Sequence, residues 1–181
     1  MNVDPNIVFP LLDHELAVYE RLYRIVISGG AVIALSYNER RTNDVDVVMG
    51  DMNDEMTKAA DVVGKQLKLK EGWLNKSAES FNADFGLGWE NRLRDVYIGK
   101  HLIVSAIHED DLIRSKYFAF LNRGLDLEDL VFLNPSRITI IKLMKEAISE
   151  NKIPRPKHDI FLDANDLLRE LGHEELKSNE Q

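Results

Sequence analysis

The feature that most constrains the fold is a pair of glycines between two short apolar runs, the second of which carries two aspartates. Residues 24–28 are β-branched and predict a buried strand that stops at Gly29 and Gly30. Residues 31–37 predict a short apolar helix, and residues 44–49 a second strand. Because successive strand side chains alternate between faces, Asp44 and Asp46 share one face. The pattern therefore predicts two adjacent strands of a mixed sheet with two carboxylates side by side.

These residue types suit the chemistry of a phosphate and its metal ion. Neighbouring carboxylates repel one another and are tolerated chiefly where a cation or a special proton arrangement relieves them. Mg²⁺ prefers oxygen ligands and commonly binds through one or two carboxylates together with substrate phosphates. Gly29 and Gly30 lack side chains, so backbone N–H groups can approach a phosphate closely, and Arg41 can clamp phosphate oxygens. Alternatively, the glycines form only a tight turn and Arg41 is a surface arginine paired with an acid.

Composition excludes several classes of protein. The chain has 181 residues, 44% of them hydrophobic and 30% charged, which is typical of a folded soluble domain. It has no cysteine, so disulfides, thiolate metal sites and cysteine nucleophiles are excluded. The net charge of −8 argues against nonspecific nucleic-acid binding. No signal pattern and no apolar run of about 20 residues is present, so we expect a cytoplasmic protein that does not bind membranes.

The remaining segments predict an α+β fold with a helical C-terminal portion. Helical spacing of apolar residues predicts helices over 10–23 and 53–69, and residues 95–98 and 102–106 predict a β-hairpin. From residue 109 onward the pattern is helical, with further helices over 136–150 and 158–171. We therefore expect an α/β core over residues 1–108 and a helical portion over 109–181, packed together as one compact unit.

The motif Arg-x-Thr-x-Asp-x-Asp over residues 40–46 and its preceding Gly-Gly turn resemble a known family. They are similar to the nucleotidyltransferase-fold proteins of an uncharacterised bacterial group (DUF6036-like) associated with toxin–antitoxin and abortive-infection systems. Further similarity follows at Trp73-Leu74-Asn75, at Asp111-Leu112-Ile113 with Lys116, and at Arg123 with Asp126 and Asp129. The resemblance covers residues 24–133.

The resemblance implies a nucleotidyltransferase-like mixed β-sheet flanked by helices, a nucleoside triphosphate substrate and Mg²⁺ as cofactor. Asp44 and Asp46 would hold the metal and act in catalysis, and the nucleotide would bind at Gly29, Gly30, Arg41, Thr42 and Lys116. Active members of the wider superfamily often have Gly-Ser where this chain has Gly-Gly. They also carry a third carboxylate on a later strand, for which Asp95 is the candidate here.

Two functions from different classes remain open at this point. The first is a Mg²⁺-dependent nucleotidyltransferase that moves a nucleoside monophosphate onto a hydroxyl of a protein, an RNA or a small molecule. The second is a catalytically weakened nucleotidyltransferase fold that binds a protein, such as a cognate toxin or antitoxin. A helical DNA-binding regulator built on residues 109–171 is disfavoured by the acidic charge balance.

Several residues also have purely structural interpretations. Lys116 either reaches a cleft from its helix or lays its stem along apolar surface with the ammonium in water. Asp126 is favoured as a helix N-cap, with Asp129 adding charge to the first turn. Trp73 and Trp89 are favoured as core residues over platforms for a base.

Overall fold

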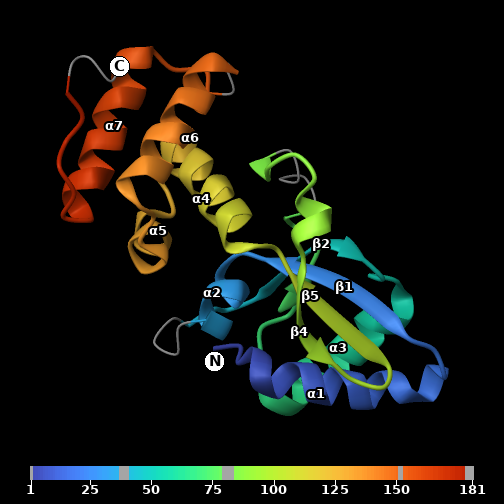
Figure 1. Ribbon diagram of the computed structural model, residues 1–181. Helices are drawn as coiled ribbons and strands as arrows, with labels where there is room; N and C mark the ends of the chain where they lie inside the picture. The colour runs from blue at the N-terminus through green and yellow to red at the C-terminus, as the bar shows by residue number, and fades with distance from the viewer. Residues whose placement is uncertain (1, 37–40, 79–83, 151–152, 178–181) are drawn as a thin grey trace. The chain divides into compact units, whose positions relative to one another are not determined.

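The computed structural model describes residues 2–36, 41–78, 84–150 and 153–177 (Figure 1). The chain divides into two compact units, Met1–Leu112 and Ile113–Gln181. The first unit contains a β-sheet with helices, whereas the described residues of the second contain helices and connecting segments. This composition confirms the predicted α+β class. Within the described residues, no helix combines the length and apolar character needed to cross a bilayer.

The first unit is built on a five-stranded mixed sheet in the order β3-β2-β1-β5-β4. The strands are β1 (Tyr23–Ser28), β2 (Val45–Gly50), β3 (Leu74–Asn75), β4 (Arg94–Ile98) and β5 (Leu102–Ala106). β1 pairs antiparallel with β2 and parallel with β5, while β2 pairs parallel with β3. The predicted adjacency of residues 24–28 and 44–49 is confirmed, and so is the hairpin, which pairs β4 antiparallel with β5.

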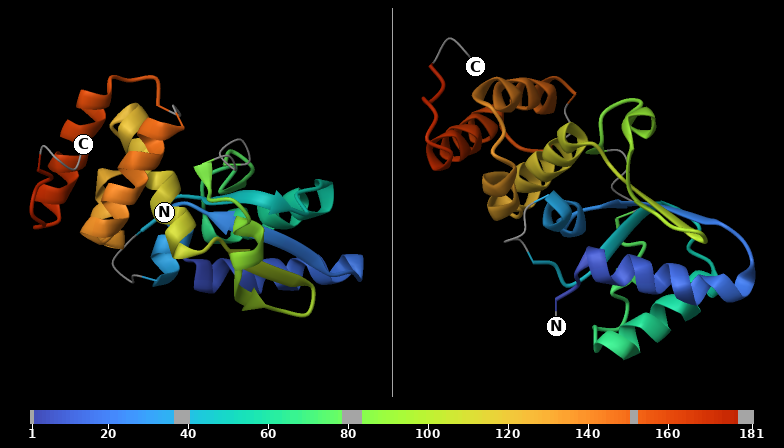
Figure 2. Two further views of the ribbon diagram at one scale, coloured as in Figure 1. Left: turned by 45° about the horizontal axis from the view of Figure 1, so that its top comes forward. Right: turned by 60° about the horizontal axis from the view of Figure 1, so that its bottom comes forward.

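Helices α1 (Pro5–Leu16) and α3 (Asp54–Leu67) lie side by side along one face of this sheet (Figures 1 and 2). The apolar residues of the central strands and of these helices form the core. Fully buried members include Leu12, Leu16, Ile25, Ile27, Val45, Val47, Met56 and Val63. The short α2 (Gly30–Ser36) connects β1 to the segment that precedes β2. The described residues of the unit also include the 3₁₀ turns η1 (Ala17–Tyr19) and η3 (Trp89–Arg92).

The first helix differs from the prediction of a helix over residues 10–23. It begins earlier because the Asp4 carboxylate accepts a hydrogen bond from the Asn6 amide and Pro5 occupies the first turn, where a missing N–H costs nothing. It ends at Leu16, and Glu20 adopts a left-handed conformation with φ of 53°. Tyr23 belongs to β1 instead, where its side chain is fully buried. Tertiary burial therefore overrides helical spacing at this end.

The second unit contains α5 (Leu127–Leu133), α6 (Arg137–Ser149) and α7 (Lys157–Glu170), together with most of α4 (Glu109–Arg123). Helices α6 and α7 pack side by side (Figures 1 and 2). The hydroxyl of Ser136 caps α6 by accepting from the Thr139 amide, as expected for a helix over 136–150. Arg114 of α4 donates to the Glu146 carboxylate of α6.

Candidate functional site

The two glycines form a turn directly against the side chains of Asp46 and Thr42. Gly29 has φ of +70°, a conformation that L-residues with a Cβ rarely adopt. A Cβ on Gly29 would lie 2.7 Å from Asp46 Oδ2, and a Cβ on Gly30 would lie 3.0 Å from Thr42 Oγ1. In the sheet, Ser28 is paired with Asp46. The glycine turn therefore leaves the Asp46 carboxylate accessible at the end of β1, and side chains in the turn would crowd it.

Thr42 positions the backbone of the first aspartate. Its buried hydroxyl donates to the Asp44 carbonyl oxygen at 2.9 Å and accepts from the Asp44 amide at 3.4 Å. Its own carbonyl accepts from the amide of Val3 at 2.8 Å, which joins the N-terminal segment to this motif. Thr42 thus orients the segment that carries the aspartates, and its hydroxyl is occupied by Asp44.

The two aspartates lie at the start of β2, and one of them has a lysine partner that sequence reasoning missed. Asp44 immediately precedes the strand, and Asp46 is its second residue. Lys70 Nζ lies 2.7 Å from Asp44 Oδ2, with exposed side-chain fractions of 53% for Lys70 and 33% for Asp44. The only sequence signal for Lys70 is its place before Leu74-Asn75, the two-residue strand that pairs with β2.

The donor set at β2 fits a divalent cation that also binds a substrate. Asp44 and Asp46 supply carboxylate oxygens, which Mg²⁺ prefers, and both side chains are partly exposed. Among the described residues, no group of three His, Cys, Asp or Glu side chains comes together to form a protein-only metal site. Such a pair matches a site in which substrate phosphates supply the remaining ligands.

Asp95 is not brought to this pair. It lies in β4, is exposed, and its Oδ1 accepts from the Ser105 hydroxyl at 2.6 Å. In the sheet order, β1 and β5 separate β4 from β2, so the two strands are about 14 Å apart. The sequence of β5, which lies next to β1, contains no carboxylate. The sheet therefore places the predicted third carboxylate far from the first two.

Arg41 is exposed just ahead of the Thr42–Asp44 segment. The neighbouring Arg40 lies outside the described residues.

Lys116 belongs to the second unit, where it is held by two carboxylates. Its Nζ lies 2.7 Å from both Asp126 Oδ1 and Asp129 Oδ2. Burial lowers the pKa of Lys116, but the Asp129 and Asp126 charges and hydrogen bonds outweigh burial and raise it above 10.5. Lys116 is thus the cation of an ion cluster within the second unit, an arrangement that neither interpretation of its sequence included.

The predicted N-cap position of Asp126 is confirmed, and Asp129 lies in the first turn of the same helix. Asp126 occupies the N-cap position of α5 with φ of 70°, but its side chain makes no capping hydrogen bond. Its carboxylate instead accepts from Lys116 Nζ, because a lysine in a largely buried setting requires a compensating charge.

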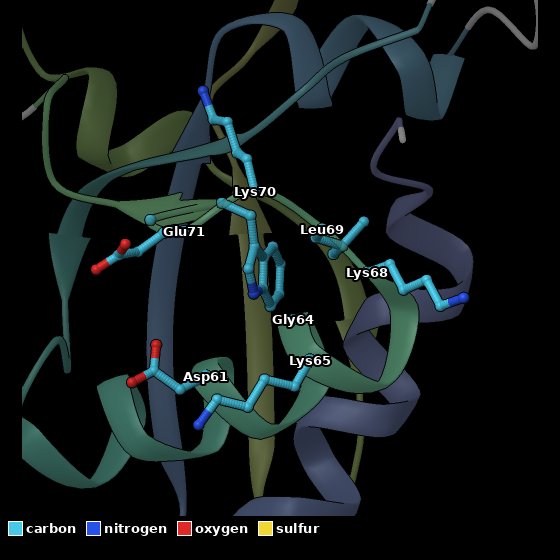
Figure 3. A pocket seen from close by; sticks show the side chains of 9 residues that line it. Asp61, Gly64, Lys65, Lys68, Leu69, Lys70 and Glu71 are labelled. Carbon is cyan, nitrogen blue, oxygen red and sulfur yellow. The ribbon is translucent and has the colours of Figure 1, made fainter.

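Both tryptophans are core residues, as favoured. Trp73 is 2% exposed, and its indole N–H donates to the Ala60 carbonyl at 2.8 Å. Trp89 is also buried and packs on Phe85 with ring centroids 5.1 Å apart. Beside Trp73, a hollow of about 440 Å³ is lined by residues between Asp61 and Trp73, including Lys65 and Lys70 (Figure 3).

Asp111 fixes the segment that leads into β4. Its side chain is buried in the first turn of α4 and accepts from the Gly86 amide at 3.0 Å. Arg92 donates to the same carboxylate through Nη2 at 2.7 Å and Nε at 3.1 Å. Asp111, one of the residues that carried the family resemblance, therefore has a structural role within the first unit.

Comparison with known protein families identifies a match over most of the chain. Residues 8–153 match the family described as "Nucleotidyltransferase of unknown function (DUF6036)", so the chain belongs to that family. No match was found among curated proteins or among solved structures. The match covers the glycine turn, both aspartates and Lys70, and it extends through α4 and α5.

Proposed function

We propose that this member of the nucleotidyltransferase family binds a nucleoside triphosphate at the Gly29–Gly30 turn and transfers its nucleoside monophosphate to an acceptor hydroxyl. The proposal rests on the close approach of this turn to the Asp46 carboxylate. A Cβ on Gly29 would lie only 2.7 Å from Asp46 Oδ2. Phosphates at a side-chain-free turn would lie beside two carboxylates, which makes a shared cation the simplest way to relieve their repulsion.

In this proposal, each residue of the site has a distinct role. Asp44 and Asp46 hold Mg²⁺, which would offset the negative charge of the phosphates and of the leaving group. Gly29 and Gly30 admit the phosphates to the turn, and the exposed Arg41 binds phosphate oxygens through its planar guanidinium. Thr42 keeps the Asp44 backbone in place through its hydroxyl.

The proposed reaction is an in-line displacement at the α-phosphorus. The acceptor oxygen forms a bond to this phosphorus, the bond to the bridging oxygen breaks, and pyrophosphate leaves with the electron pair. The acceptor proton passes to a base, for which Asp95 stays a prediction. Because β5 and β1 separate β4 from β2, Asp95 acts as this base only if its carboxylate comes within hydrogen-bond distance of the attacking hydroxyl. Asp95→Asn should then lower the transfer rate and leave nucleotide affinity unchanged.

A second candidate is a weakened nucleotidyltransferase fold that binds a cognate toxin or antitoxin. Two observations favour it. β5 carries no carboxylate beside β1, and a serine at Gly30 would crowd the Thr42 hydroxyl. The retained Asp44 and Asp46 pair favours the enzyme, because two carboxylates close together supply oxygen ligands for a Mg²⁺ ion that also binds substrate phosphates.

A transfer assay separates the two candidates. Purified protein is incubated with Mg²⁺, cell extract and each of the four nucleoside triphosphates labelled at the α-phosphate. The enzyme predicts label on a protein, an RNA or a small molecule, and loss of that label in Asp46→Asn with an unchanged circular dichroism spectrum. Label that persists in Asp46→Asn would reveal a contaminating activity. If no nucleotide yields label, the transferase proposal is rejected in favour of the binding protein.

A further inference from the structure

Lys70 reaches Asp44 from a turn that is firmly attached to the sheet. The Trp73 amide donates to the Lys70 carbonyl at 3.2 Å, which closes the turn. The Val45 amide in turn donates to the Trp73 carbonyl at 2.6 Å, so the turn is joined to β2 beside Asp44. The backbone therefore holds Lys70 next to the candidate metal ligand.

The base of this turn is also fixed against α3. The Trp73 indole donates to the Ala60 carbonyl, and the Leu69 amide donates to the Gly64 carbonyl at 2.8 Å. A Cβ on Gly64 would lie 3.0 Å from the Trp73 ring, so helix and ring are closely packed. Hydrogen bonds thus hold the backbone on both sides of Lys70, while its exposed side chain has room to change rotamer.

The Lys70 side chain points away from the other charged groups around the hollow. Figure 3 shows Lys70 extending away from α3, whereas Asp61 and Lys65 lie along that helix. The Lys70 ammonium ends 2.7 Å from Asp44 Oδ2, in an ion pair of which both side chains are partly exposed. Asp44 thus already has a cation, supplied by the protein itself.

We propose that Lys70 is an exchangeable counter-ion of Asp44, which leaves the carboxylate when a divalent cation arrives with nucleotide. This inference rests on the proposed function. A divalent cation bound to the same carboxylate would face the ammonium across a few ångströms, and like charges at that distance repel. The free protein therefore binds metal weakly. When nucleotide brings its phosphates, the displaced ammonium gains a new anionic partner, so Lys70 favours the metal–nucleotide complex.

Replacing Lys70 should change the affinity for a divalent cation in opposite directions without and with nucleotide. Lys70→Met removes the competitor, so the affinity of the nucleotide-free protein for Mn²⁺ should rise about twofold to fivefold, the range expected for a partly exposed ion pair. The same variant loses the ammonium–phosphate contact, so its affinity for Mn²⁺ with a nonhydrolysable nucleoside triphosphate should fall. A purely structural role for Lys70 would not change the two affinities in opposite directions.

Lys65→Met is the matched control, because Lys65 lines the same hollow and its loss changes net charge equally. Lys70→Arg keeps the positive charge and should restore weak binding of Mn²⁺. The full-length variants are titrated with Mn²⁺ alone and then with Mn²⁺ and nucleotide. Free Mn²⁺ is followed by electron paramagnetic resonance, and thermal denaturation checks the fold.

The outcomes distinguish this inference from the proposed function. If Asp44→Asn/Asp46→Asn binds Mn²⁺–nucleotide as well as the wild type, the proposed function fails. If that pair is required but Lys70→Met matches Lys65→Met in both titrations, Lys70 is not an exchangeable counter-ion and only this inference fails. An absence of Mn²⁺ binding in both the wild type and Lys70→Met also overturns it, because removal of the competitor should expose the site.

Discussion

Gly29→Ala alters the backbone position that most directly controls access to Asp46. The residue adopts φ of +70°, where an alanine costs about 1–2 kcal/mol. The new Cβ would lie 2.7 Å from Asp46 Oδ2, while Asp46 Cγ and Cβ stay at ordinary distances of 3.7 Å and 3.8 Å. Rotation of the carboxylate therefore relieves the clash without moving the strand. The predicted result is a moderate loss of stability with a large loss of nucleotide binding.

Two other glycines set the scale for this prediction. Gly72 has φ of +69° with no atom within 4 Å of an added Cβ, so Gly72→Ala measures the backbone cost alone. Forcing a side chain off its preferred torsion adds about 0.5–1.5 kcal/mol, so Gly29→Ala should cost about 1.5–3.5 kcal/mol. In Gly50, an added Cβ would lie 2.2 Å from the Arg24 carbonyl oxygen, and backbone cannot rotate away. Gly50→Ala should therefore cost most.

Urea denaturation followed by tryptophan fluorescence measures the free energy of unfolding of the first unit, because both tryptophans, Trp73 and Trp89, lie in it. Calorimetric titration with magnesium and a nonhydrolysable nucleoside triphosphate measures binding. We expect the loss of stability to increase from Gly72→Ala through Gly29→Ala to Gly50→Ala. Gly72→Ala leaves the Asp46 carboxylate accessible and should bind nucleotide much more tightly than Gly29→Ala. Wild-type affinity in Gly29→Ala would refute the reasoning, as would a stability loss larger than that of Gly50→Ala.

Two further predictions concern buried charge and pH. Lys116→Met removes the ammonium between Asp126 and the buried Asp129. The free energy of unfolding, measured by circular dichroism in urea, should therefore fall by about 3 kcal/mol. A fall of less than about 1 kcal/mol would contradict a stabilising role for the Lys116–Asp126–Asp129 cluster. Burial and the Glu55 hydrogen bond raise the pKa of Tyr23 from 10.0 to about 12, so stability should decline as the pH rises from 10 to 12. Tyr23→Phe should lack this decline, and an equal decline in both proteins would exclude Tyr23 as its cause.

The sheet core and the candidate site could be predicted because their signals are local. Residues 24–28 are a β-branched run that ends at two glycines, and residues 44–47 alternate charged and apolar side chains. A short helical connection between such strands restricts them to neighbouring positions in one sheet. The paired Asp44 and Asp46 are visible from spacing alone. The structure adds the reason for the glycines, which is the close approach of the turn to Asp46.

The features that sequence reasoning missed depend on contacts between distant residues. The partnership of Lys70 with Asp44 rests on β3, which is only two residues long and shows no periodicity. Asp126 has the local signature of a helix cap, but its carboxylate turns to Lys116 because a largely buried ammonium needs a counter-charge. Rules based on neighbouring residues cannot include this requirement, because Lys116 becomes buried only when the helices pack.

The separation of Asp95 from the pair also depends on strand order. The hairpin of β4 and β5 was predicted, but its attachment to β1 through β5 was not. If β4 had been the neighbour of β1, Asp95 would lie one strand closer to β2. Strand order is set by the packing of the whole sheet, which no single segment encodes.

The most direct test of the central claim is a calorimetric titration of the wild type and of Asp44→Asn/Asp46→Asn with a nonhydrolysable nucleoside triphosphate in the presence of Mg²⁺. Asp61→Asn, which alters an exposed carboxylate on α3, controls for surface charge. The account predicts that the paired substitution weakens binding by at least about tenfold, equivalent to about 1.4 kcal/mol, while Asp61→Asn binds as the wild type does. Equal affinity in the wild type and in Asp44→Asn/Asp46→Asn would contradict the assignment of this pair to the metal–nucleotide complex.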